Sequence, residues 1–534
     1  MIMKTIIKII LFTVVIVLYS ATSCVNLDTT PKDKVTDIEF WKNKNAVFNM
    51  INSCYSLISS ASEIEYADAM SDNAYVKVSN DFNQALANGT ASTADKYAHK
   101  IWNSRYTGIR YSNLVLDNIH LATYLNEEMA RRYTAEAKTM RAYQYFELVS
   151  KFGDVPFFKH AVSIEESQKV KRTNRNTIIS EILQDLQDII DNKSLPESYS
   201  ANDIGRITHW TAMALKARID LFEGHYREVK DLTSSIMSKS KHRLFPSYSG
   251  LFTIANENNE EVLWDIQYKP NSREHSIQSQ FLPPSRLGYA QLVPLQSLVS
   301  NYITLDGYAI EDAPAGSYDP NNMFDNRDPR LAATIAYTGN SYKLKDGTDH
   351  VINIDKGANP DGFGFASSCS PSGYYIKKYW DNTYSTNLRS GLNYIIIRYA
   401  DVLLMHAEAL VELNEMNDEG WNTTIKPIRQ RAGFTESSAI EYPGNTNIKE
   451  IVRKERRSEL AMEGLRTKDI IRWRIAENVL NGWALGFYTG DIIGTQNGFV
   501  EVEKRKFDKN KNYLWPIPQS ERDLNSNLSQ NPNW

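Results

Sequence analysis

Apolar side chains recur at intervals of three and four residues along several long segments, a pattern that predicts a mainly helical protein. The strongest segments are residues 134–153, 208–226 and 394–415. Each has two apolar faces with small residues between large ones, which favours helices packed on both sides over one-faced surface helices. A partner helix is expected after each of them, at residues 176–190, 226–239 and 419–433.

These helices form pairs of a repeating kind. An alanine is followed four residues later by a bulky apolar residue, as in Ala142/Phe146 and Ala217/Leu221, which resembles the tetratricopeptide pattern. Residues 38–60 and 97–124 supply a further candidate pair. We therefore predict a mainly all-α fold, a tetratricopeptide-like helical superhelix of about four helix pairs. The spacing is irregular, so the repeats are divergent.

The segment between the helical stretches is different. Residues 241–394 are rich in Gly, Pro, Asn, Asp and Tyr, and short strands are expected within residues 261–268 and 373–380. Long loops in compact proteins are commonly functional or disordered, and the aromatic residues within these loops favour ordered loops that carry a site. We predict a single domain, residues 38–534, with helical repeats at about 38–240 and 395–475 and a loop-rich central region at about 241–394.

The first residues are typical of a targeting signal. Lys4 and Lys8 precede an apolar run at residues 9–19, which is too short to span a bilayer as a helix but suits a signal peptide. Small residues then lead to Cys24, as a lipoprotein signal peptidase requires. We predict a lipoprotein signal peptide at residues 1–23, a lipid anchor at Cys24 and a tether at residues 24–37. The alternative is an ordinary secretory signal in which Cys24 is incidental.

Composition narrows the class of protein. Of 534 residues, 42% are apolar and 23% are charged, so a large core is possible and wholesale disorder is not expected. A net charge of -4 argues against a nucleic-acid partner. The two remaining cysteines, Cys54 and Cys369, are too few for a disulfide framework and are predicted to be buried thiols. The 30 Tyr, 19 Phe and 10 Trp serve either a large core or a stacking platform for a ligand.

Signatures of catalysis are absent from the sequence. It contains no GxSxG, HExxH, GxxxxGK[ST] or GxGxxG motif, and its nine histidines show no pair at metal-ligand spacing. We therefore predict no catalytic residue, no metal ligand and no cofactor. Asp319, Asp325 and Asp328 could supply oxygen ligands to calcium, but roles in turns and caps are favoured.

One acid-rich segment nevertheless resembles an active site. Glu455, Glu459 and Glu463 recur at helical spacing and share an apolar face with Arg456 and Arg466. Buried carboxylates are tolerated when guanidinium groups pair with them, whereas a glycosidase holds two carboxylates about 5–10 Å apart across an open cleft. Structural ion pairing is therefore favoured, and the same holds for Arg398, Asp401 and Glu408. The residues expected to point to solvent are Arg453, Lys454 and Arg457.

A family resemblance is carried by the same segment. Residues 455–473, "ERRSELAMEGLRTKDIIRW", closely resemble the ER-x-x-EL-x-x-EG-x-R-x-x-D signature, with its closing RW, of the SusD-like (RagB/SusD) nutrient-binding lipoproteins. Other matching motifs follow in family order. They run from "EFWKN" at residues 39–43, through "RYADVLLMHAEALVE" at 398–412, to "YLWPIPQSERDLNSNLSQNPNW" at 513–534. The resemblance thus covers the mature chain from end to end.

The resemblance implies a function as well as a fold. It implies a lipid-anchored protein on the exterior of the outer membrane, partnered by a SusC-like TonB-dependent β-barrel transporter that it caps like a lid. The usual cargo is an oligosaccharide, which such proteins bind and deliver without catalysis. We therefore expect a glycan-binding lipoprotein and no enzyme. Two rival hypotheses are an α/α-type glycoside hydrolase and a protein-interaction scaffold that binds no sugar.

The ligand site is expected to be an aromatic platform built from loops. Sugars present C–H faces that stack on rings and hydroxyls that need polar partners. Residues 65–83 and 279–292 offer both, and the resemblance implies that both regions approach the binding face. The candidate ligand-binding residues are Asp72, Asn73, Tyr75, Phe82, Phe281, Arg286 and Tyr289. In the alternative, these rings only pack the loops onto the helices.

Overall fold

The computed structural model describes residue 3 and residues 37–77, 83–355, 359–384, 388–491 and 495–534. Cys24, nearly all of the predicted signal peptide and tether, and Phe82 lie outside the described residues. Within the described part, every helix is too short or too polar to cross a membrane.

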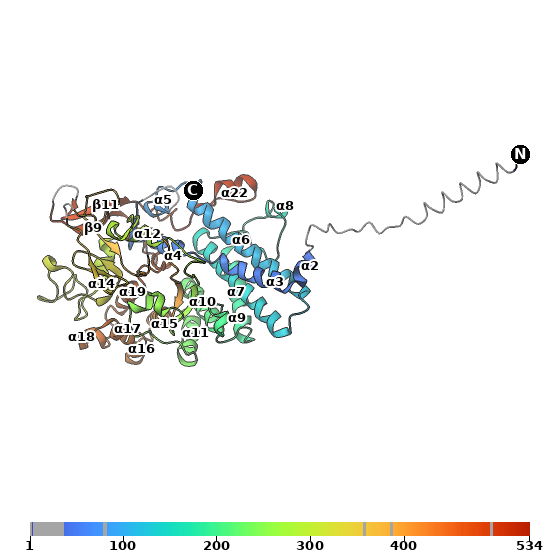
Figure 1. Ribbon diagram of the computed structural model, residues 1–534, viewed down its shortest axis with the longest axis horizontal. Helices are drawn as coiled ribbons and strands as arrows, with labels where there is room; N and C mark the ends of the chain where they lie inside the picture. Colours follow the sequence, from blue (N-terminus) through green and yellow to red (C-terminus); the bar gives the residue numbers. More distant parts are fainter. Residues whose placement is uncertain (1–2, 4–36, 78–82, 356–358, 385–387, 492–494) are drawn as a thin grey trace.

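The N-terminal half of the chain is a stack of helices (Figure 1). Its long members are α3 (Lys44–Ser56), α6 (Lys96–Asn118), α7 (Glu127–Phe152), α9 (Arg175–Asp191), α10 (His209–Glu223) and α11 (Tyr226–Lys239). Each packs on the next along the chain, and the stack continues onto α15 (Tyr399–Glu412), which contacts α10 and α11. The predicted mainly helical, tetratricopeptide-like fold is confirmed.

Local chemistry sets the ends of these helices. The Asn126 side chain accepts a hydrogen bond from the Met129 N–H at the start of α7, and Thr208 and Thr211 form a capping box at the start of α10. Gly224, in the left-handed conformation, ends α10. Every residue of α10 from His209 to Leu221 is buried, as the two-faced pattern predicts.

The segment at residues 394–415 is divided between a strand and a helix. β8 (Tyr394–Arg398) pairs antiparallel with β2 (Val262–Ile266), and α15 begins only at Tyr399. The prediction of one helix from residue 394 was therefore wrong. A short run of apolar β-branched residues fits a helix face and a buried strand equally well, and pairing with β2 decides for the strand.

Short strands form small sheets within the loop-rich region and in the segments that pack beside it. The pairs are β1 (Ala74–Val76) with β3 (Leu292–Pro294), β4 (Ile335–Ala336) with β7 (Tyr375–Ile376), and β5 (Ser341–Lys343) with β6 (Asp349–Val351). A three-stranded sheet has the order β10 (Thr495–Gln496), β11 (Phe499–Arg505), β9 (Gly482–Tyr488). β2 and β7 confirm the strands predicted within residues 261–268 and 373–380.

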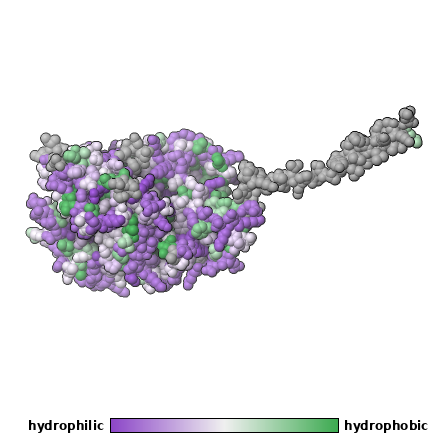
Figure 2. Space-filling view, in the orientation of Figure 1, coloured by the Kyte–Doolittle hydropathy of each residue, from purple (hydrophilic) through white to green (hydrophobic). Residues whose placement is uncertain are grey.

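Shorter helices connect these elements. They are α2 (Asp37–Lys42), α4 (Ala61–Ala67), α5 (Gln84–Asn88), α8 (Ile164–Ser167), α12 (Gln278–Phe281), α13 (Gln296–Asn301), α14 (Pro329–Thr334), α16 (Asp418–Thr423), α17 (Ile425–Ala432), α18 (Ser437–Ile440), α19 (Ile448–Glu459), α20 (Arg466–Arg472), α21 (Ala476–Val479) and α22 (Gln519–Leu524). One apolar core lies among the stacked helices around Trp102 and Met140, and a second lies beneath the loops around Tyr302 and Tyr374. Hydrophilic residues cover most of the face shown in Figure 2.

Candidate functional site

The acid-rich segment, residues 455–472, does not form one continuous helix. α19 ends at Glu459, and the chain then reverses through Met462 and Gly464, both with positive φ, before α20 begins at Arg466. A side chain at Gly464 would meet the Ile64 carbonyl oxygen at 2.7 Å, so the turn requires glycine. Glu463 therefore projects from a turn and not from the helix face on which the spacing placed it.

The three glutamates are nevertheless buried together and fully paired. Glu455 accepts hydrogen bonds from Arg330 at 2.7 Å and from Arg429 at 2.8 Å. Glu463 accepts a bidentate pair from Arg398, with both distances 2.8 Å. The remaining contacts are those of Glu459 with Arg330 (2.9 Å), Arg398 (2.6 Å) and Arg431, and of Glu463 with Lys378 (2.6 Å). The predicted structural ion pairing is confirmed.

This pairing removes the chemistry that a glycosidase would need. Burial alone would raise the pKa of Glu459, but Arg431, Arg398 and Arg330 hold that pKa well below its usual value. A carboxyl group that stays ionised has no proton to give, and every oxygen here already accepts from a cation. A general acid needs the opposite, a raised pKa beside an open cleft.

The neighbouring charges extend the same network. Asp401 pairs with Arg218 at 2.5 Å and with Arg456 at 2.7 Å, as expected for a structural residue. Glu408 accepts from both Arg472 Nη atoms and from the Trp473 indole. Arg457 was expected at the solvent face. It is instead largely buried, pairs with Asp72 at 3.1 Å and donates to the Asp72 carbonyl and the Asn73 side chain, so residues 72–73 lie against that face of α19.

A second candidate site lies where three loop segments meet. Strands β1 and β3 place Tyr75 opposite Val293, and the Lys77 N–H donates to the Gln291 carbonyl at 2.7 Å. The Lys77 ammonium donates to three further carbonyl oxygens, those of Tyr289 (3.0 Å), Ser367 (2.6 Å) and Cys369 (3.3 Å). One lysine thus ties residues 74–77, 289–294 and 367–369 together.

Two exposed rings and two half-buried rings lie on these tied segments or near them in the chain or in space. The Tyr289 side chain is 46% exposed and that of Phe365 is 54% exposed. Tyr384 is half-buried beside Tyr289, and burial together with that neighbour raises the pKa of Tyr384 to about 12, so its phenol is neutral. We refer to Tyr289, Phe365 and Tyr384, with Tyr75, as the aromatic surface. Rings of this kind in solvent offer faces to an apolar or sugar ligand.

Three predicted ligand residues do not face solvent. Phe281 is fully buried in the core beneath the loops, so its ring offers no free face. Asp72 is buried between Arg457 and Arg466, which hold its carboxyl pKa well below the usual value. The Asn73 amide donates to Asp68 at 2.8 Å, and its oxygen accepts from Arg457 at 2.8 Å. These residues support the loops from beneath and do not contact the surface.

The other predicted residues lie nearer the solvent. Tyr289 belongs to the aromatic surface, and Tyr75 is half-buried with its hydroxyl 3.5 Å from the Gln84 amide nitrogen. Arg286 is half-buried, and its Nε donates to the Ser285 carbonyl at 2.8 Å. Phe365, Tyr384 and Lys77 were missed. They lie on loops that are far apart in the sequence. Lys77 and its partner Ser367, for example, are separated by 290 residues, and no sequence period relates such segments.

A serine, histidine and aspartate also meet near Arg286. The Ser285 hydroxyl donates to Asp361 at 2.5 Å, and the His350 Nε2 lies 2.8 Å from the same hydroxyl. In a serine hydrolase the histidine lies between serine and carboxylate, so that it can take the serine proton. Here the serine lies between the other two, and its hydroxyl donates a hydrogen bond to the aspartate. The arrangement fixes the loop and does not prepare a nucleophile.

The remaining polar candidates have structural roles. Asp319 accepts from the Asn321 N–H at 2.9 Å, and Asp328 caps α14 and pairs with Arg330, which confirms the predicted cap roles of these two residues. In the part of the chain that the structure describes, no cluster of three or more His, Cys, Asp or Glu side chains could hold a metal ion. Cys54 and Cys369 are buried free thiols, as predicted.

Known proteins resemble the chain along nearly its whole length. A family model described as "SusD family" matches residues 250–534, and one described as "Starch-binding associating with outer membrane" matches residues 26–221. The SusD-like protein P25 of Formosa agariphila is 26% identical over 517 residues, which cover 89% of this chain and 92% of that protein. A solved SusD-like carbohydrate-binding protein of Bacteroides fragilis is 28% identical with a TM-score of 0.82, covering 92% of this chain and 100% of that one. A second SusD-like structure from the same organism is 25% identical with a TM-score of 0.79, covering 94% and 100%.

Proposed function

The chain belongs to the SusD family, and from this premise we propose that it is a glycan-binding protein of the cell surface that captures oligosaccharides on its aromatic surface. The observation that carries the proposal is the exposure of Tyr289 and Phe365 on loops that Lys77 holds together. The carbohydrate-binding relative from Bacteroides fragilis supports the same ligand class.

Capture of a sugar suits this surface for physical reasons. Ring faces stack on the C–H faces of sugar units, while nearby polar groups accept or donate hydrogen bonds to hydroxyls. Ser285 and Arg286 stand on the same loop as Tyr289, and Gln280 lies beside that loop on the short helix α12, where its carbonyl accepts from the Gln291 N–H. Because Lys77 holds the loops together before the ligand binds, we expect the loops to lose little conformational entropy on binding.

Binding without catalysis is part of the proposal. In the acid-rich segment, guanidinium groups pair with the carboxylates that could otherwise act as acid or base. Incubation with oligosaccharides should therefore return them intact. Release of shorter products by the purified protein, and its loss in a Glu459→Gln variant, would favour the hydrolase hypothesis instead.

Delivery to a membrane partner completes the proposed function. We propose that a lipid on Cys24 anchors the protein in the outer membrane, that residues 24–37 act as a tether, and that residues 38–534 form one domain outside. The bound glycan would pass to a SusC-like TonB-dependent transporter. The family description "Starch-binding associating with outer membrane" supports this location.

The anchor has its own test. One acyl chain holds a protein on a membrane only marginally, so stable anchoring rests on several chains at one cysteine. Cys24→Ala should give soluble or unprocessed protein after cell fractionation, whereas Cys54→Ala, which removes a buried thiol, should remain with the outer membrane. A Cys24→Ala protein that stays in the washed membrane fraction would contradict the anchor.

The glycan proposal is tested by a glycan-array screen followed by calorimetry. The tightest oligosaccharide is titrated into wild type, Tyr289→Ala and, as a matched control, Tyr124→Ala, whose ring is 39% exposed on the connection between α6 and α7. We expect lost affinity in Tyr289→Ala alone. Binding of no oligosaccharide by wild type, or equal affinity in all three proteins, would overturn the proposal.

A further inference from the structure

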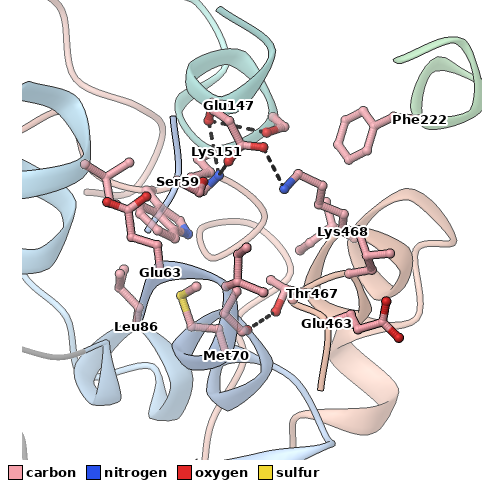
Figure 3. A pocket seen from close by; sticks show the side chains of 18 of the residues that line it. Ser59, Glu63, Met70, Leu86, Glu147, Lys151, Phe222, Glu463, Thr467 and Lys468 are labelled. Carbon is pink, nitrogen blue, oxygen red and sulfur yellow. Dashed lines mark hydrogen bonds and ion pairs between the residues drawn. The ribbon is translucent and has the colours of Figure 1, made fainter. Parts of the chain in front are cut away.

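A cavity of about 110 Å³ lies between the first helical repeats and the C-terminal part of the chain (Figure 3). Its walls come from α4, α6, α7, α20 and residues 512–515, and it shares no lining residue with the aromatic surface. Met70, Leu86 and Phe222 supply apolar wall. The cavity is therefore a second, separate site.

Charged groups of both signs line this cavity. Glu147 on α7 pairs with Lys151 of the same helix and with Lys468 of α20 at 2.9 Å, and Figure 3 shows both ammonium groups directed at that one carboxylate. Arg105 of α6 pairs with Glu63 of α4. Two carboxylates thus face three cations.

The other charged lining residues do not correct this imbalance, because their partners lie elsewhere. Arg218 is neutralised by Asp401, and Glu463 is neutralised by Arg398 and Lys378. The cluster of Arg105, Glu63, Lys151, Glu147 and Lys468 therefore carries one surplus positive charge. The side chains of Lys151 and Lys468 are 16% and 22% exposed, whereas those of Arg105 and Glu147 are almost fully buried. A charge that is largely removed from water is stabilised when an opposite charge accompanies it.

An unused hydrogen-bond donor points to the same need. The Arg105 side chain is 1% exposed, and its Nη atoms donate to Leu57, Gln144, Ser59 and Glu63. Its Nε–H has no acceptor among the described residues. A water molecule could accept from this donor, but it would leave the surplus charge in place.

We propose that this cavity binds a small monovalent anion, a carboxylate of the size of acetate or a halide, between Lys151, Lys468 and Arg105. Such an anion would balance the charge and accept from the free donor. It would also join α7 to α20, which belong to the two ends of the chain. The apolar wall leaves room for a methyl group beside the charged end.

The protonation of Lys151 supports this arrangement. Burial lowers the pKa of Lys151 to about 8, and the charges of Lys468 and Arg105 add to that shift while Glu147 opposes it. A bound anion stabilises the ammonium form, so it should raise this pKa. Conversely, anion affinity should fall as the pH rises above about 8 and Lys151 loses its proton.

The test compares two salts on the full-length protein in neutral detergent. Melting temperature is measured by calorimetry in potassium acetate and in potassium gluconate, which is too large for the cavity, at equal ionic strength and pH 7. We expect a saturable rise in melting temperature with acetate that shrinks above pH 8. Lys468→Met, which removes the surplus charge, should abolish the acetate effect. The control is Lys138→Met, which should retain the effect, because Lys138 lies elsewhere on α7 and pairs with Asp185 of α9.

Equal melting temperatures in both salts, or an acetate effect that survives in Lys468→Met, would overturn the proposal. A crystal of the wild-type protein soaked in sodium bromide gives a result that does not depend on the variants. We expect an anomalous bromide peak bordered by Lys151, Lys468 and Arg105. Only water at that position would contradict the anion site.

Discussion

The acid-rich segment and the aromatic surface differ in every respect that bears on function. The first gathers Glu455, Glu459 and Glu463 among arginines, and all of these carboxylates are buried and paired. The second has rings such as Tyr289 and Phe365 that are about half exposed. The region richest in reactive groups holds the fold together, while the region with few reactive groups is the one that we propose binds a ligand.

The difference shows that a dense cluster of charged residues indicates a structural role when each carboxylate is buried and paired. Each carboxylate of the acid-rich segment is matched by cations from elements remote in sequence, including Arg330 on α14 and Arg398 on β8. Such a cluster joins α14, β8, α17 and α19 into one unit. Breaking it should cost stability, whereas breaking the aromatic surface should cost affinity.

A buried and an exposed ring in one loop region give the largest contrast. Phe281→Ala removes a fully buried ring from the core beneath the loops, and we expect a loss of about 3–5 kcal/mol in the free energy of unfolding. Tyr289→Ala should change it by less than about 0.5 kcal/mol. Urea denaturation measures both. Similar losses of unfolding free energy in the two variants would contradict the assignment of Phe281 to the core and Tyr289 to the surface.

Breaking the acid-rich segment comes next. Glu459→Gln removes one of the buried negative charges that Arg330, Arg398 and Arg431 share, and leaves Glu261, Glu455 and Glu463 as their remaining partners. We therefore expect a loss of about 3 kcal/mol in the free energy of unfolding. The control is Glu441→Gln, which breaks an exposed pair with Lys426 and should cost no more than about 1 kcal/mol. Wild-type stability in Glu459→Gln would argue against a structural role.

Acid should weaken the same segment. Although Asp401 is buried, Arg218 and Arg456 lower its pKa to about 2, and the pKa values of Glu455, Glu459 and Glu463 are also lowered. These carboxyl groups bind protons more readily in the unfolded chain, so their stabilisation is present above about pH 4.5 and is lost as the pH falls toward 2. Urea midpoints across that range should fall in wild type and in Tyr289→Ala alike. A flat profile would contradict the ion-pair account.

The sequence predicted the helical part well and the sites only in part. Helices α7 and α10 follow from two apolar faces, which burial on all sides requires. The break after Glu459 was not visible, since it depends on Gly464 approaching Ile64 from a distant helix. Tyr289 and Phe281 occur in the same Pro- and Gly-rich stretch, so composition could not tell the exposed ring from the buried one. Phe365 stands two residues before Ser367, whose carbonyl accepts from Lys77, and the sequence does not reveal that long-range contact.

The smallest expected change in free energy concerns the ligand itself. Removing one stacking ring among several should weaken oligosaccharide binding by about 1 kcal/mol or slightly more. We expect this loss in Phe365→Ala as well as in Tyr289→Ala, with unchanged melting temperatures. The control is Phe48→Ala, which removes a ring of similar exposure (41%) from α3. An equal loss in the Phe48 variant would show that exposure alone, and not position, sets the effect.

The most direct experiment measures both affinity and melting temperature for one variant from each region. The oligosaccharide that binds wild type most tightly is titrated by calorimetry into Glu459→Gln and into Tyr289→Ala, at a temperature where both variants are folded, and the melting temperature of each is recorded. The account predicts a lowered melting temperature with unchanged affinity for Glu459→Gln, and lowered affinity with an unchanged melting temperature for Tyr289→Ala. Lost affinity and an unchanged melting temperature in Glu459→Gln would contradict it, because the acid-rich segment would then be the functional site.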